Sequence, residues 1–208
     1  MKHNIPTQKK GRQLDTSQSI SFHNNQSAKD FYHIVRNRLL NINAWHQVAK
    51  LPLASFQLLD HTGQPKDKKP AIGDYLRINV PGPGLQSTDG YDIVHIDNIE
   101  ETNEKNLQIV TITLRPSMDP TAMQDHEIKH FFSNLATSTL QVKRAERTIE
   151  ANYFGRNEVI NLDMDHLSEK IRNLLIGVGA KLGFSFPQWK SLMSGLVNNE
   201  IITSSNTK

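Results

Sequence analysis

Residues 107–114 read LQIVTITL, and this stretch indicates how the chain folds. From Val110 onward, apolar side chains alternate with threonine, so Val110, Ile112 and Leu114 fall on one face of an extended segment. β-branched residues dominate the stretch, as is typical of a strand that is packed on one side. We therefore predict a strand with one covered face.

Similar segments precede and follow this strand, with turns between them. Further strands are predicted at residues 19–23, 56–60, 74–80, 91–99, 137–143 and 148–154. The last two are close enough in sequence to form a hairpin that turns at residues 144–147. Alternating segments joined by turns favour an antiparallel sheet with one face packed on a core.

Two short helices are expected between the first and second strands. Ser27 would cap the first helix, with Asp30 in place of the usual glutamate of a capping box. Apolar residues then recur at helical spacing and define one face. Residues 44–50 would form the second helix, which Pro52 stops.

The strongest helical pattern lies near the C-terminus, at residues 165–182. Its apolar stripe consists of Leu167, Ile171, Leu174, Leu175, Val178 and Leu182. Gly177 and Gly179 interrupt the stripe at about 1 kcal/mol each relative to alanine, which indicates close approach to the sheet or space left for something else. A shorter helix is expected from Pro187 through Leu196.

Length and composition narrow the class of protein. A chain of 208 residues suits one domain, which we expect at residues 18–200, between a disordered basic tail at 1–17 and a flexible tail at 201–208. The chain has no cysteine, which excludes disulfides, thiolate metal sites and a cysteine nucleophile. This composition fits a cytoplasmic protein.

Neither a membrane span nor a nucleic-acid partner is expected. The most apolar stretch, residues 174–186, contains Lys181 and is too short to cross a bilayer. The N-terminal residues have positive charge without the apolar core of a signal peptide. The formal net charge of +3 comes from basic residues that are spread along the chain, whereas nucleic-acid-binding proteins usually concentrate them on one face.

The predicted order is a strand, two short helices, six strands and a long helix. This order resembles the helix-grip fold of the START-like superfamily, which includes the birch-pollen allergens, lipid-transfer domains and polyketide cyclases. The resemblance is carried by residues 27–50 with Trp45 near their end, by GDYLRI at 73–78, and by residues 165–182. It implies an α+β fold in which a curved antiparallel sheet of about six to seven strands grips a long C-terminal helix around an apolar cavity.

The favoured hypothesis is a non-enzymatic or weakly enzymatic pocket protein that binds a small apolar ligand of lipid or aromatic type, without a cofactor. A curved sheet closing on one helix with two internal glycines is not easily filled with side chains, and ligand pockets are concave and mostly apolar. The expected lining residues are Ile78, Val94, Ile96, Ile112, Leu140, Tyr153, Leu175 and Val178.

One short motif suggests a different chemistry. The sequence HEIKH at 126–130 matches the H-E-x-x-H signature of zinc metalloproteases. On a helix, His126 and His130 lie one turn apart and could both ligate zinc while Glu127 activates a bound water. The third ligand that a catalytic zinc needs is missing from the spacing of the extended motif. We favour a surface helix without metal here and keep a zinc hydrolase as the first alternative.

A second alternative is a protein-interaction module with a vestigial pocket. Its surface would include an exposed patch around Trp189 and Leu192, and a homodimer is left open. On the strands, His95 could act as a pocket acid or base, and Arg77 and Arg115 could anchor a ligand carboxylate. Strand arginines are more often solvent-facing, and we favour that position for both.

Overall fold

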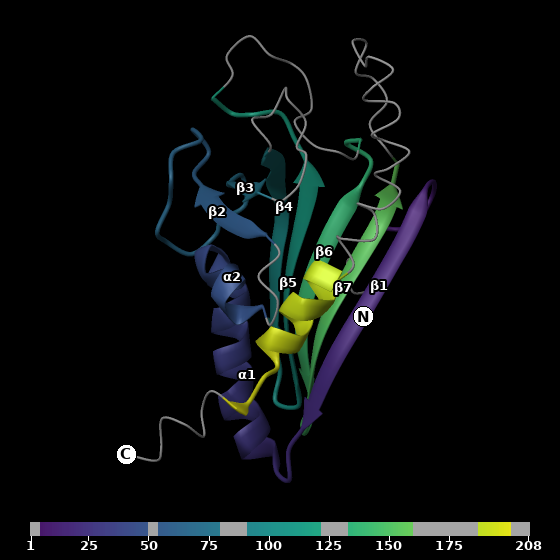
Figure 1. The fold of residues 1–208 in the computed structure, drawn as a ribbon. Helices are drawn as coiled ribbons and strands as arrows, with labels where there is room; N and C mark the ends of the chain where they lie inside the picture. The colour runs from purple at the N-terminus through teal and green to yellow at the C-terminus, as the bar shows by residue number, and fades with distance from the viewer. Residues whose placement is uncertain (1–4, 50–53, 80–90, 122–132, 160–186, 201–208) are drawn as a thin grey trace.

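Seven strands form one antiparallel sheet in the order β1-β7-β6-β5-β4-β3-β2 (Figure 1). The computed structural model describes residues 5–49, 54–79, 91–121, 133–159 and 187–200, and the statements below concern these residues. The strands are β1 (Arg12–Ser21), β2 (Ser55–Leu59), β3 (Tyr75–Asn79), β4 (Tyr91–Asn103), β5 (Leu107–Pro116), β6 (Thr137–Ala145) and β7 (Thr148–Glu158). The expected α+β fold with an antiparallel sheet of six to seven strands is confirmed.

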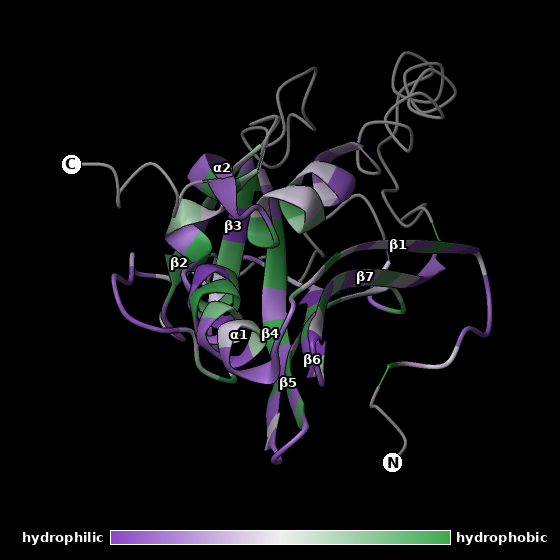
Figure 2. Ribbon diagram, turned by 90° about the horizontal axis from the view of Figure 1, so that it is seen from below, coloured by the Kyte–Doolittle hydropathy of each residue, from purple (hydrophilic) through white to green (hydrophobic). Residues whose placement is uncertain are grey.

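The hydrophobic core lies on one face of the sheet, and we call this face the inner face. It carries Val110, Ile112 and Leu114 of β5, as the alternation predicts, together with Leu140 and Val142 of β6. Hydrophobic and hydrophilic residues alternate along the strands in Figure 2. The helices lie over this inner face, so the core forms between one sheet and one layer of helices.

Strand β1 corrects the prediction of a disordered tail at residues 1–17. The strand begins at Arg12 and pairs with β7 through Ser21, so residues 12–17 are part of the sheet edge. The segment is mostly polar, with Leu14 as its buried apolar residue. Its structure depends on backbone hydrogen bonds to a strand far away in sequence, a pairing that local apolar alternation does not reveal.

The first helix, α1 (Asn25–Leu40), begins earlier than predicted. Its cap is Asn24, whose side-chain oxygen accepts a hydrogen bond from the backbone N–H of Ser27 at 2.8 Å. Ser27 therefore lies inside the helix and is not its cap. The second helix is a 3-10 turn, η1 (Ile42–Ala44), followed by α2 (Trp45–Val48), so it ends before the expected residue 50.

A β-bulge interrupts the alternation in β4. Ile96 pairs with Leu114, but Asn98 pairs with Thr113, so β4 has one extra residue at this point. The extra residue places Ile99 opposite Ile112, and Ile99 packs against the core. Strict alternation would have turned Ile99 to the outer face.

The C-terminal part of the described chain packs on the sheet. Residues 187–196 are helical, as predicted from Pro187, and bury Trp189, Leu192, Met193 and Leu196. Arg38 of α1 donates hydrogen bonds from Nη1 to the carbonyl oxygens of Leu196 and Asn198, both at 2.8 Å. These bonds satisfy backbone acceptors at the end of the helical segment.

Several predicted features lie outside the described residues. They are the long helix at 165–182 with Leu175 and Val178, the motif at 126–130, and the tail at 201–208. In the part of the chain that the structure describes, no helix is long and apolar enough to cross a membrane.

Candidate functional site

Six of the eight predicted lining residues come together on the inner face. Five neighbouring strands, β3 to β7, contribute them, and all belong to one buried cluster. They are Ile78, Val94, Ile96, Ile112, Leu140 and Tyr153. The other two, Leu175 and Val178, lie outside the described residues. The inner face is therefore continuous and apolar from β3 to β7.

Trp189 covers part of this face. Its ring stacks on Tyr153 with a centroid distance of 4.7 Å and an interplanar angle of 13°. It also meets Phe56 of β2 and Trp45 of α2, at centroid distances of 6.1 and 6.5 Å. The expectation of an exposed patch around Trp189 and Leu192 is wrong, because both side chains are buried in the core.

A second β-bulge, at Asn157, changes the direction of the end of β7. Leu14 pairs with Gly155 while Arg12 pairs with Glu158, so three steps along β7 match two along β1. Asn157 has a φ of 54°, in the left-handed region that asparagine tolerates better than most residues. Bulges of this kind re-aim side chains, and here the bulge returns the Glu158 side chain to the inner face.

Gly155 provides the space in which the Glu158 carboxyl lies. Position 155 follows Ile149, Ala151 and Tyr153 in the inward alternation of β7. A Cβ atom built on Gly155 would overlap Glu158 Oε1 and would lie 3.3 Å from Glu158 Cδ. The carboxyl therefore lies over the glycine backbone on the inner side of the sheet, next to the apolar face.

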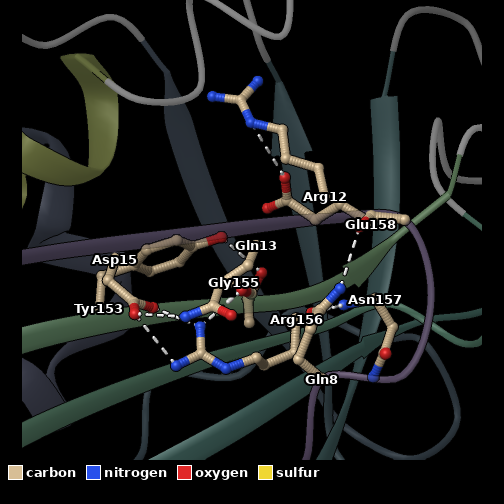
Figure 3. Close-up of polar contacts among 11 residues, drawn as sticks. Gln8, Arg12, Gln13, Asp15, Tyr153, Gly155, Arg156, Asn157 and Glu158 are labelled. Carbon is tan, nitrogen blue, oxygen red and sulfur yellow. Dashed lines mark hydrogen bonds and ion pairs between the residues drawn. The ribbon is translucent and has the colours of Figure 1, made fainter.

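The Glu158 carboxyl is buried and incompletely bonded. Only 3% of its side chain is exposed, and Oε2 has no hydrogen-bond partner among the described residues. Arg12 approaches it, but the 3.9 Å between Arg12 Nε and Oε2 is an ion-pair distance and too long for a hydrogen bond (Figure 3). Burial raises the pKa of Glu158, and the opposing effects of Arg12 and Arg156 are smaller.

Two hydroxyl groups lie at the same end of the inner face. Tyr153 Oη and Ser138 Oγ are 2.9 Å apart, so one donates a hydrogen bond to the other. Burial raises the pKa of Tyr153, and the negative charge of Glu158 raises it further. Ser138 pairs with Gly155 in the register of β6 and β7, so the hydroxyl pair lies beside the glycine over which the Glu158 carboxyl lies. Together, Glu158, Tyr153, Ser138 and Arg12 form what we call the polar end of the inner face.

The N-terminal segment holds the bulge in place. The backbone N–H groups of Lys9 and Lys10 donate to Asn157 Oδ1 at 2.6 and 3.2 Å, and Asn157 Nδ2 donates to the carbonyl of Thr7 at 3.1 Å. The backbone N–H of Asn157 donates to Gln8 Oε1 at 2.9 Å. These four bonds join residues 7–10 to the residue before Glu158, within the tail that was expected to be disordered.

Arg156 points away from the polar end. Its guanidinium pairs with Asp15 of β1 and lies 5.5 Å from the ring centre of Phe154. Because Asp15 balances its charge on the outer face, Arg156 acts on Glu158 only at longer range.

The strand residues with candidate roles as a pocket base or carboxylate anchor also lie on the outer face. Asp97, at the bulge of β4, is 3.1 Å from His95 Nδ1 and accepts a hydrogen bond from Arg115 Nε at 2.5 Å. Arg77 stacks over the ring of Tyr91 at 5.3 Å. Since alternate strand residues point to opposite faces, the side chains of His95, Arg115 and Arg77 all face away from the inner cluster.

The zinc alternative rests on residues outside the described ranges. His126, Glu127 and His130 all lie there, so a zinc hydrolase stays a prediction. Within residues 5–49, 54–79, 91–121, 133–159 and 187–200, no three histidine, cysteine, aspartate or glutamate side chains are grouped so that they could hold a metal ion.

Sequence reasoning did not place Glu158 among the residues that line the pocket. By strict alternation, position 158 belongs to the outer face of β7. The one local signal is the order Gly155, Arg156, Asn157, in which a glycine and an asparagine near the end of a strand can mark a bulge. That signal does not say which residue the bulge re-aims, because the register with β1 decides it.

No protein-family model matches the sequence, and no curated protein matches it. Among solved structures, Ara h 8.0201 is 13% identical, with 90% of this chain and 100% of that chain covered and a TM-score of 0.33. Truncated norcoclaurine synthase from Thalictrum flavum is 11% identical, with 94% and 100% covered and a TM-score of 0.34.

A third similar structure is the di-domain ARO/CYC BexL from the BE-7585A biosynthetic pathway. It is 11% identical, with 90% of this chain covered and a TM-score of 0.35, and the chain spans 51% of its length. The three structures are similar to this chain in fold alone.

Proposed function

We propose that this protein binds a small, mainly apolar ligand of lipid or aromatic type against the inner face of its sheet. The observation that carries the proposal is the combination of a continuous apolar face with one buried polar end. The face extends from Phe56 on β2 to Ala151 on β7, and Glu158 lies at the end of β7. Ligand sites have this composition, with hydrophobic lining and a few placed polar groups.

A bound ligand explains the buried Glu158 carboxyl better than a purely structural role does. Nearly all buried polar atoms in folded proteins have a hydrogen-bond partner, so an unpartnered carboxyl oxygen requires an explanation. Replacing such a group by an apolar one would be cheaper for stability alone. A ligand that supplies the missing partner accounts for keeping the carboxyl.

Native mass spectrometry of the purified protein, beside its denatured spectrum, tests the proposal first. We expect an organic mass that is lost on denaturation. Titration with the fluorescent probe 1-anilinonaphthalene-8-sulfonate then measures binding to the folded protein directly. A protein that carries no extra mass and binds no probe while it remains folded would contradict the proposal.

Two leucine variants locate the binding. Ala151→Leu adds volume to the inner face, where Ala151 is fully buried, and should weaken probe binding at least severalfold. Glu150→Leu adds a leucine to the neighbouring position on the outer face, where Glu150 pairs with Lys143, and should leave the affinity unchanged. Circular dichroism confirms that both variants fold. Equal effects of the two changes would place the probe elsewhere.

A further inference from the structure

We propose that Glu158 is the anchor for a neutral hydroxyl group of the ligand, so the ligand is an amphipathic alcohol or phenol. This inference rests on the proposed function and names the chemistry of its polar end. The carboxyl oxygen Oε2 is buried, faces the inner side of the sheet and has no hydrogen-bond partner among the described residues. An acceptor in this state fits a donor group that the ligand brings.

The charges around the carboxyl favour a neutral donor. The Nε atom of Arg12 lies 3.9 Å from Glu158 Oε2. A ligand ammonium group would have to enter beside the Arg12 guanidinium, and a ligand carboxylate would meet Glu158 itself. Like charges at such distances repel strongly where water is excluded. A hydroxyl group avoids both repulsions.

The hydroxyl pair of Tyr153 and Ser138 provides the complementary half of the site. Each of these side chains carries one O–H hydrogen, and the bond between them uses only one of the two. The remaining hydrogen can be donated to an incoming oxygen. A ligand hydroxyl at the polar end would donate to Glu158 Oε2 and accept from this pair, so both of its roles would be satisfied.

The position of the Glu158 carboxyl is determined by the backbone around it. Gly155 leaves room for it over the strand, and the left-handed conformation of Asn157 turns it inward. The bonds from residues 7–10 to Asn157 hold that conformation. An acceptor held in this way is preorganised, so binding a donor loses little conformational entropy.

Four naphthalene probes that differ in one substituent test the inference. They are 2-naphthalenemethanol, 2-methylnaphthalene, 2-naphthalenemethylamine and 2-naphthoate. The alcohol should bind the folded wild-type protein about 10-fold more tightly than the methyl compound, the scale of one buried hydrogen bond to a charged group. The amine and the carboxylate should bind more weakly than the alcohol.

Variants of Glu158 connect the preference to the carboxyl. In Glu158→Leu, the alcohol should bind no better than 2-methylnaphthalene, whose own affinity should remain. Glu158→Gln keeps an acceptor oxygen and should retain part of the preference, and it provides the test if the leucine variant does not fold. Glu150→Ala, on the outer face of the same strand, is the matched control and should change nothing.

The outcomes distinguish a failure of the hydroxyl site at Glu158 from a failure of apolar ligand binding as a whole. Equal affinity for the alcohol and the methyl compound overturns the hydroxyl site but leaves apolar binding intact. Tightest binding of the amine, lost in Glu158→Leu, overturns it in favour of a cation site. A protein that binds none of the four probes contradicts the proposed function as well.

Discussion

The carboxyl of Glu158 lies over the backbone of Gly155, on the inner face of the sheet. A side chain at position 155 would lie 3.3 Å from Glu158 Cδ and 3.2 Å from Leu14 Cβ, and it would overlap Glu158 Oε1. The Glu158 carboxyl therefore occupies the space that a side chain at position 155 would fill. This relationship joins the bulge, the buried charge and the polar end of the face.

Gly155→Ala should lower the free energy of unfolding by about 1–3 kcal/mol, because the added methyl group displaces the carboxyl in a packed region. Urea unfolding measures the change. In a Glu158→Ala background most of this cost should disappear, since the carboxyl is no longer there, and only the contact with Leu14 remains. An unchanged cost in the double variant would show that the glycine has another role.

Glu158→Gln should change how stability depends on pH. Burial raises the pKa of Glu158 in the folded protein, so its favourable contribution is complete below the unfolded-state pKa and is lost as pH rises through the folded-state pKa. Arg12, Arg156 and Tyr153 are the other titratable groups that act on it.

The glutamine variant does not titrate at this position. Relative to the wild type, it should therefore gain stability on the order of 1 kcal/mol between acidic and neutral pH, the scale of a buried unpaired polar group. Urea unfolding from pH 4 to pH 8 provides the comparison. Parallel curves for the two proteins would mean that the carboxyl is not desolvated.

Replacing Asn157 by alanine should destabilise the protein more than replacing it by glycine. Both variants lose the side-chain bonds to Thr7, Lys9 and Lys10, but glycine adopts a φ of 54° without strain. Alanine should cost about 1 kcal/mol more than glycine, the scale of the left-handed penalty. Amide hydrogen exchange at Lys9 and Lys10 should become faster in both variants. Retained protection in the two variants would contradict the attachment of this segment through Asn157.

Trp189→Ala should destabilise the protein by about 3–5 kcal/mol, the range for removing a large buried aromatic side chain. The stacking with Tyr153 and the contacts with Phe56 and Trp45 are lost together. Thermal and urea unfolding measure the loss. Lys190→Ala, at the exposed neighbouring position, should change stability by less than about 0.5 kcal/mol. Similar values for the two variants would mean that the helical segment contributes little to the core.

The amino-acid sequence by itself determined which side chains of the central strands face the core. Val110, Ile112 and Leu114 lie inward as their alternation predicts, and so do Leu140 and Tyr153. This succeeds because the two-residue period of a strand is a local property, and a slip of one residue would expose a whole apolar face to water. The order of strands and helices was then predicted from the points where the apolar residues change between strand spacing and helical spacing.

Only the tertiary structure determined which residues form the polar end of the inner face. β1 is a polar segment that becomes a strand by pairing with β7, and its register leaves one extra residue at Asn157. That extra residue reverses the face on which Glu158 lies, and Gly155 makes room for its carboxyl. Trp189 covers Tyr153 from a distant part of the chain. Pairing register and packing between distant segments carry no local period, so a pattern along the sequence could not place these groups together.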